Sequence, residues 1–252
     1  PDRIFPLIRS QPETTRLGTR RGLNVVRGLI HAHSVHSHDA CDGEPELENG
    51  EPNEPCLDDF RNAICETRQD YVFLTEHEGL AAFHDFDELS LIRGTDEPII
   101  GANGRVIANR MTCDNGHVAT IIPGGEFSLM PIGMTDHLPG TPEERDAAYN
   151  EVTLDRVQSY KDLGAVVLQG HAESRDRDEL RQLNLDGFEV YQLHANVDPD
   201  IRADWLGLDR FGFVAEALPF IQNKTESNPD LVFLTFVSPN VPSVEHFDAL
   251  VS

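Results

Sequence analysis

Four short apolar runs of this chain end at a histidine, and a fifth ends at a glutamate. The residues that end these runs are His31, His77, His171, His194 and Glu126. Helical segments separate the runs, and strands that alternate with helices predict a parallel sheet. In parallel barrels the functional side chains lie at the carboxyl ends of the strands, where the loops converge. We therefore expect side chains that are distant in the sequence to meet at one rim of an α/β barrel.

The densest group of possible metal ligands follows the first of these runs. Residues 31–39 hold four histidines and one aspartate: His31, His33, His36, His38 and Asp39. Alternate residues of an extended segment share a face, so His31 and His33 can both reach one ion, while Asp39 can fold back to a second. A solvated polar loop is the alternative interpretation. Because neutral imidazole is a common metal ligand, the pattern favours a metal site.

These side chains determine which chemistry the site could perform. Imidazole and carboxylate ligands suit zinc, manganese or iron, and a carboxylate can bridge two ions. Two neighbouring ions lower the pKa of a shared water and stabilise an in-line displacement at phosphorus. The sequence has no G-x-S-x-G elbow, no P-loop and no G-x-G-x-x-G after a strand. A metal-dependent hydrolase is the expected class, although a Ser/His/Asp triad stays open because its members need no fixed spacing.

The length and charge of the chain limit the number of domains and the classes of binding partner. The chain has 252 residues, enough for one α/β barrel domain over residues 1–252. Residues 1–22 are expected to form an extended lead-in, and the acidic, Pro- and Gly-rich stretch 40–56 a surface loop. With 44 acidic and 20 basic residues the net charge is −24, which argues against nucleic acid or an anionic membrane as partner. No apolar run approaches the length of a membrane span.

Local patterns predict most of the regular elements. Strands are expected at 23–30, 71–75, 106–112, 118–123, 165–168 and 188–191. Helices are expected at 57–68, 154–163, about 211–224 and 243–252, and an apolar run covers 231–237. Another helix begins at Thr141-Pro142-Glu143-Glu144, which has the sequence of a capping box.

The cysteines suggest an oxidising compartment. An even number, Cys41, Cys56, Cys65 and Cys113, points to two disulfides and to an exported protein, periplasmic or extracellular. Cys56 and Cys65 flank or lie in the predicted helix, where they would be about 13 Å apart, too far for a disulfide. Each is therefore expected to pair with Cys41 or Cys113. Buried thiols in a cytosolic enzyme are the alternative.

Taken in order, the motifs resemble those of the PHP (polymerase and histidinol phosphatase) family of metal-dependent phosphoesterases. The family's opening H-x-H motif, with a following Ser and then Asp or His, is matched by His31, His33, Ser37 and Asp39. Its later motifs are similar to Thr75-Glu76-His77, Gly124-Gly125-Glu126, His137, Gly170-His171-Ala172 and Glu189-Val190-Tyr191-Gln192. The likeness covers about residues 25–195.

The resemblance implies a distorted TIM-like (β/α)7 barrel that holds two or three divalent ions, of zinc, manganese or iron. It implies three ligand sets: His31, His33 and Glu126; then Glu126, His137 and His171; and finally Asp39 and His77. The implied catalytic residues are His31, His33, Glu126 and His171.

Some assignments have alternatives. His38 can replace Asp39 as a ligand, depending on the local register, and His194 either lines the pocket or binds metal. His117 is a rival to His137, but its turn-like context predicts a surface histidine. The family also closes with a D-x-H motif, and nothing after Leu231 matches it. We expect the last strand to lie outside this chain; the alternative is an incomplete site.

The expected function is hydrolysis of a phosphate ester in a small phosphorylated substrate by a metal-activated water. A neighbouring histidine would protonate the leaving group. Two alternatives remain open: a non-catalytic, exported metal-binding or interaction protein on the same barrel, and a related metallohydrolase that acts on C–N or C–O bonds.

Overall fold

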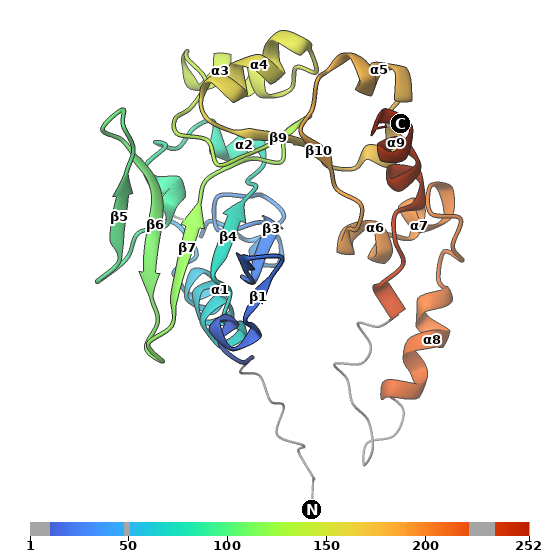
Figure 1. Cartoon of the computed structure of the whole chain (residues 1–252), viewed down its shortest axis with the longest axis horizontal. Coiled ribbons are helices and arrows are strands. Elements are labelled where there is room, and N and C mark those ends of the chain that lie inside the picture. Colours follow the sequence, from blue (N-terminus) through green and yellow to red (C-terminus); the bar gives the residue numbers. More distant parts are fainter. Residues whose placement is uncertain (1–10, 48–50, 222–234, 252) are drawn as a thin grey trace, which may run out of the picture. The chain divides into compact units, whose positions relative to one another are not determined.

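The computed structural model describes residues 11–47, 51–221 and 235–251. The chain divides into two compact units. The first, here called the N-terminal unit, spans Leu7–Leu168, and the second, the C-terminal unit, takes up the chain from Gln169. Both mix helices with short strands (Figure 1).

A five-stranded sheet is the centre of the N-terminal unit. Its strand order is β3 (Gly28–Ala32), β4 (Tyr71–Leu74), β7 (Val118–Ile122), β6 (Val106–Thr112) and β5 (Glu97–Ile100). Figure 1 shows these strands side by side. Strands β3, β4 and β7 run parallel to one another, whereas β6 and β5 are added in antiparallel pairs. The carboxyl ends of the three parallel strands therefore lie at one edge of the sheet.

The start of the chain differs from the sequence prediction. The strand expected over 23–30 is divided, since β2 (Leu23–Asn24) pairs with β1 (Thr19–Arg20) in a hairpin and β3 begins only at Gly28. The lead-in is also less extended than expected, because residues 14–17 form one turn of 3-10 helix. The other strands predicted for this sheet, over 71–75, 106–112 and 118–123, are confirmed to within one residue.

The apolar core of this unit lies between the sheet and helix α1 (Glu54–Thr67). Leu57 and Ile64 of α1 are buried and cluster with Val72 and Leu74 of β4. Residues seven positions apart in a helix lie on the same face, and so do alternate residues of a strand. Fully burying each such side chain contributes about 1.5–3 kcal/mol.

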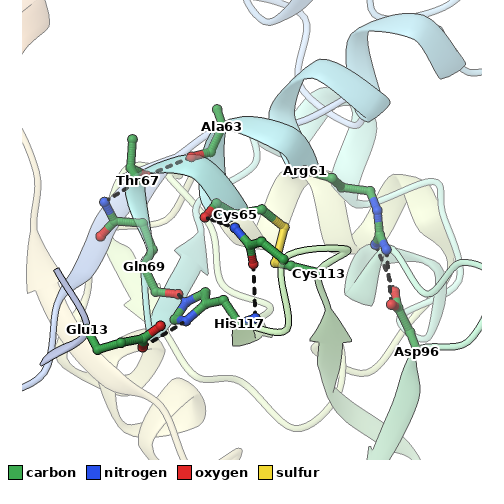
Figure 2. The surroundings of a disulfide bond; sticks show 10 residues. Glu13, Arg61, Ala63, Cys65, Thr67, Gln69, Asp96, Cys113 and His117 are labelled. Atoms are coloured by element: carbon green, nitrogen blue, oxygen red, sulfur yellow. Dashed lines mark hydrogen bonds and ion pairs between the residues drawn. A yellow bond between two sulfur atoms is a disulfide. The ribbon is translucent and has the colours of Figure 1, made fainter. Parts of the chain in front are cut away.

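Two disulfides fasten α1 to its surroundings. Cys65 is bonded to Cys113, at the turn that follows β6 (Figure 2), and Cys41 is bonded to Cys56 in the first turn of α1. The prediction that Cys56 and Cys65 do not pair with each other is confirmed. Disulfides of this kind are typical of oxidising compartments.

A partly buried ion pair links α1 to the segment before β5. The Arg61 guanidinium donates hydrogen bonds of 2.8 and 3.0 Å to the carboxylate of Asp96 (Figure 2). The Asn109 amide donates a further bond of 2.9 Å, and the Arg93 backbone N–H one of 3.1 Å. Burial alone would raise the pKa of Asp96, but these donors outweigh it and hold the pKa below the ordinary value of 3.8.

We expect Asp96→Ala to destabilise the protein by about 2 kcal/mol at neutral pH, because it removes hydrogen bonds to a charged group and leaves the Arg61 guanidinium with the Leu91 carbonyl oxygen but without its carboxylate. A folded-state pKa below the unfolded one gives stability that is complete above the unfolded pKa, 3.8, and is lost as the pH falls through the folded value. Urea unfolding of both proteins, from neutral pH down to about pH 2, should therefore show the difference shrinking in acid. The exposed Asp87, paired with Arg105, supplies the control Asp87→Ala, for which a loss below about 1 kcal/mol is expected. A difference that does not change with pH would contradict an ionised Asp96.

The N-terminal unit continues with smaller elements. Helix α2 (Glu78–Ala81) follows β4, and β8 (Met130–Ile132) pairs antiparallel with β9 (Val166–Gln169). Between those strands lie α3 (Pro142–Tyr149) and α4 (Leu154–Asp162). The predicted capping box is confirmed: the Thr141 hydroxyl accepts the Glu144 N–H at 3.3 Å, and the Glu144 carboxylate accepts the Thr141 N–H at 2.9 Å.

The C-terminal unit is mainly helical. Its elements are α5 (Arg177–Gln182), β10 (Gly187–Phe188), α6 (Leu193–Val197), α7 (Pro199–Asp204), α8 (Gly212–Ile221) and α9 (Val241–Val251). The strand predicted over 188–191 is thus confined to β10, and the helix predicted from 243 begins two residues earlier. Most of the apolar run at 231–237 lies outside the described residues.

Neither a closed barrel nor a membrane span occurs in the part of the chain that the structure describes. The sheets among these residues do not close on themselves, so the (β/α)7 barrel stays a prediction. No helix among them has both the length and the apolar character needed to cross a membrane.

Candidate metal centre

Three neighbouring strands deliver the candidate ligands to one edge of the sheet. The ligands from β3, β4 and β7 are, in that order, His31 with His33, His77, and Glu126. Backbone pairing continues beyond the ends of β4 and β7, where the Glu126 N–H donates to the Glu76 carbonyl oxygen at 3.1 Å. Side chains separated by up to 95 positions in the sequence are thereby brought together.

The carboxylate oxygen Oε2 of Glu126 is the point on which the histidine rings converge. It lies 2.8 Å from Nε2 of His31, 3.1 Å from Nε2 of His33 and 3.6 Å from Nε2 of His77. The four side chains keep only 12 to 22 % of their surface exposed. Three histidine ring nitrogens therefore surround one partly buried carboxylate oxygen.

His31 reaches this oxygen through a bulge in β3. The pairing register between β3 and β4 shifts after Ile30, where two residues of β3 stand opposite one of β4. His31 itself has φ 84°, a left-handed conformation that histidine adopts more readily than most residues. A bulge redirects a side chain. His31 and His33 thus meet at Glu126 by a backbone irregularity rather than by simple alternation.

A second candidate group shares His33 with the first. Oδ2 of Asp39 lies 3.2 Å from Nε2 of His77, and its Oδ1 lies 3.6 Å from Nδ1 of His33. Burial alone would raise the pKa of Asp39, but the neighbouring His33 and a hydrogen bond from Ser37 outweigh it and lower the pKa. Asp39 is therefore a carboxylate at neutral pH. His38, its alternative, is exposed, and its ring lies tilted against that of His77, with 4.5 Å between ring centroids.

Both groups fit a transition-metal ion by donor chemistry and by spacing. Within His31–His33–Glu126, and within His33–Asp39–His77, one donor atom per residue lies within 4.8 Å of each of the others. Ligands bound at about 2.0–2.2 Å around a tetrahedral zinc ion lie roughly 3.3–3.6 Å apart. Imidazole together with carboxylate is the ligand set of zinc, manganese or iron. No other group of this kind is found among the described residues.

Glu76 was named in the sequence only as part of the Thr75-Glu76-His77 motif, and its role at this edge was missed. Its side chain is fully buried and accepts hydrogen bonds from the backbone N–H of Ser34 at 3.1 Å and from the Ser34 hydroxyl at 2.5 Å. Burial raises the pKa of Glu76 to about 7. Ser34 directly follows His33, so Glu76 anchors the turn that carries the ligands. An acidic residue at the end of an apolar strand was the available signal.

His137 is not brought into either group. Its Nδ1 lies 2.7 Å from the Tyr149 hydroxyl, and its Nε2 lies 2.9 Å from the backbone oxygen of His84. Burial lowers the pKa of His137. Both ring nitrogens thus have protein partners, and the assignment of His137 to a second ion stays a prediction that rests on the resemblance.

His36 lies in the same neighbourhood as His137 rather than with the candidate ligands. Its ring centroid is 4.2 Å from that of His84. Burial, with smaller effects from His84 and Arg93, lowers the pKa of His36 to about 4. His36 is therefore a neutral, buried ring at neutral pH.

The prediction that His117 is a surface histidine is wrong. Only 6 % of the residue is exposed, and its Nε2 donates to the Gln69 carbonyl oxygen at 2.7 Å (Figure 2). The turn that carries it is held against α1 by the Cys65–Cys113 disulfide and by a bond from Asn115 to the Cys65 carbonyl oxygen. This covalent attachment buries a turn that composition alone predicts to be exposed.

His171 and His194 lie in the C-terminal unit. Their rings meet edge to face with centroids 5.4 Å apart. Nδ1 of His171 lies 3.0 Å from the carboxylate of Glu173, which also accepts a bond of 2.7 Å from the Asn240 amide. A carboxylate in this position orients an imidazole ring. The roles predicted for both histidines remain predictions.

Comparison with protein-family models, with curated proteins and with solved structures finds no match for this chain.

Proposed function

We propose that this protein is a metal-dependent phosphoesterase of an oxidising, extracytoplasmic compartment. The observation that supports it most is the convergence of His31, His33 and His77 on the Glu126 carboxylate at the carboxyl edge of three parallel strands. The two disulfides support the compartment. The PHP-like order of motifs supports the reaction class.

In this proposal His31, His33 and Glu126 would hold one divalent ion, and Asp39 with His77 would hold a second. The ions supply a water of lowered pKa and positive charge that stabilises the phosphoryl oxygens. That charge also matters for binding, because the chain carries a net charge of −24 and would otherwise repel a phosphorylated substrate.

The remaining residues of this edge have supporting roles in the proposal. His38 is exposed beside His77 and donates a proton from its ring to the leaving oxygen. Glu76 holds the turn after His33 through Ser34, so that the ligands keep their spacing when substrate binds.

The test combines metal content with turnover. Purified protein is analysed for zinc, manganese and iron, and hydrolysis of an aryl phosphate is followed for wild type, His33→Ala and Glu126→Gln. We expect bound metal and metal-dependent turnover in wild type only. Glu97→Gln, which changes an exposed carboxylate of β5, is the matched control and should behave as wild type. Equal activity in wild type and both site variants would overturn the proposal.

A non-catalytic metal-binding protein is the second candidate. It is favoured by His137, whose two ring nitrogens have protein partners and do not complete a further ligand set. Tight metal binding without turnover on a panel of phosphate, amide and ester substrates would select it. Turnover of an amide or ester alone would instead identify a metallohydrolase of C–N or C–O bonds.

A further inference from the structure

We propose that Ser37 is a positioning residue that fixes the tautomer of His33 and keeps the lone pair of its Nε2 directed at the Glu126 carboxylate. The inference rests on the proposed metal centre, which it deepens. The Ser37 side chain is completely buried, and it lies between residues of both candidate groups.

Every hydrogen-bonding position of the Ser37 hydroxyl is used. Its Oγ lies 3.0 Å from Nδ1 of His33 and 2.8 Å from Oδ1 of Asp39, and it accepts the backbone N–H of His77 at 3.4 Å. A hydroxyl group has one proton to donate and two lone pairs with which to accept. Three partners therefore satisfy it completely.

The direction of each bond follows from the one available proton. Asp39 is exposed, and an ordinary aspartate is ionised at neutral pH, so its oxygen accepts the Ser37 proton. Ser37 then has no proton left for His33. Nδ1 of His33 must donate its own proton to the serine oxygen. In neutral His33 the proton is therefore on Nδ1, and Nε2 carries the lone pair.

In this tautomer Nε2 of His33 can bind a metal ion but cannot donate a hydrogen bond to Glu126. Nε2 of His33 lies 3.1 Å from Oε2 of Glu126, so two acceptor atoms face each other. A cation that both atoms bind turns this repulsion into attraction. Polar groups that orient a metal-binding histidine through its other ring nitrogen typically contribute 10- to 100-fold to metal affinity.

The first experiment reads the tautomer directly, without metal. Two-bond ¹H–¹⁵N NMR spectra of the ¹⁵N-histidine-labelled apo-protein are recorded at about pH 8, where an unperturbed imidazole is neutral. The His33 signals are assigned by their loss in His33→Asn. We expect His33 to carry its proton on Nδ1 in the wild type, and on Nε2 in a substantial fraction of Ser37→Ala. Finding the proton on Nε2 in the wild type would overturn the proposal, whether or not the variant folds.

The second experiment measures zinc affinity by competition with a chromophoric chelator. We expect Ser37→Ala to bind zinc about 10- to 100-fold more weakly than wild type. Ser90→Ala is the matched control, because Ser90 is equally buried and its hydroxyl has no hydrogen-bond partner among the residues that the structure describes. An unchanged affinity in Ser37→Ala would overturn the role of Ser37. A wild type that binds no zinc, yet has the Nδ1 proton, would reject the proposed function and still support the hydrogen-bond assignment.

Discussion

Replacing Glu126 by alanine is expected to lower the affinity for zinc by more than about 100-fold. This is a larger loss than the one of about 10- to 100-fold that follows when a residue hydrogen-bonded to a metal ligand is replaced. The reason is that Glu126 provides the one carboxylate of the His31–His33–Glu126 group, and its Oε2 is within 3.1 Å of both histidine nitrogens. Chelator competition and the metal content after dialysis measure the effect.

The informative control is His137→Ala. The resemblance makes His137 a ligand, whereas the structure places its ring nitrogens against Tyr149 and the His84 carbonyl oxygen. We expect this variant to keep the zinc affinity of the wild type and to lose about 1–3 kcal/mol of stability, because it removes the buried ring's hydrogen bonds to the Tyr149 hydroxyl and to the His84 carbonyl oxygen. A loss of zinc as large as that of Glu126→Ala would mean that the ligands follow the motif order and not the present geometry.

Removing the Cys65–Cys113 disulfide is expected to destabilise the protein by about 4 kcal/mol and to lower its Tm by about 10 °C. The bond joins positions 48 apart in the sequence, so breaking it restores much conformational freedom to the unfolded chain. It also holds the turn that buries His117 against α1. Thermal unfolding of wild type and Cys65→Ser/Cys113→Ser measures the change.

The Cys41–Cys56 disulfide offers an internal comparison. It joins positions 15 apart, for which the same relation gives about 3 kcal/mol. Since Asp39 lies two positions before Cys41, we expect Cys41→Ser/Cys56→Ser to weaken metal binding as well, whereas Cys65→Ser/Cys113→Ser should not. Detection of free thiols in the denatured, unreduced wild type would contradict the disulfides. A loss of zinc affinity in Cys65→Ser/Cys113→Ser but not in Cys41→Ser/Cys56→Ser would contradict the link between the Cys41–Cys56 bond and the metal site.

The sequence was informative where function depends on the ends of strands. Apolar runs of four to seven residues located β4, β6 and β7, and the rule that parallel strands end at one edge predicted that His31, His77 and Glu126 would meet. Helix termini were equally readable, because the Thr141 capping box is a local interaction. These features are encoded within a few residues of where they occur.

Features that depend on tertiary contacts were not readable in the same way. Whether His137 faces a metal or Tyr149 depends on the packing of α3, and the burial of His117 depends on a disulfide to a distant helix. The raised pKa of Glu76 arises from complete burial, and an acidic residue after a predicted strand does not reveal in the sequence that it will be buried. The bulge at His31 likewise leaves no pattern that differs from plain alternation.

That bulge limits how the position can vary. A residue at φ 84° is tolerated when it is glycine, asparagine, aspartate or histidine, and β-branched side chains are strongly disfavoured there. Libraries designed to change the metal preference should therefore sample only those few residue types at position 31 and explore position 33 more widely. The same restriction gives a filter for recognising distant homologues, in which the first position of the H-x-H pair should drift only within this small set.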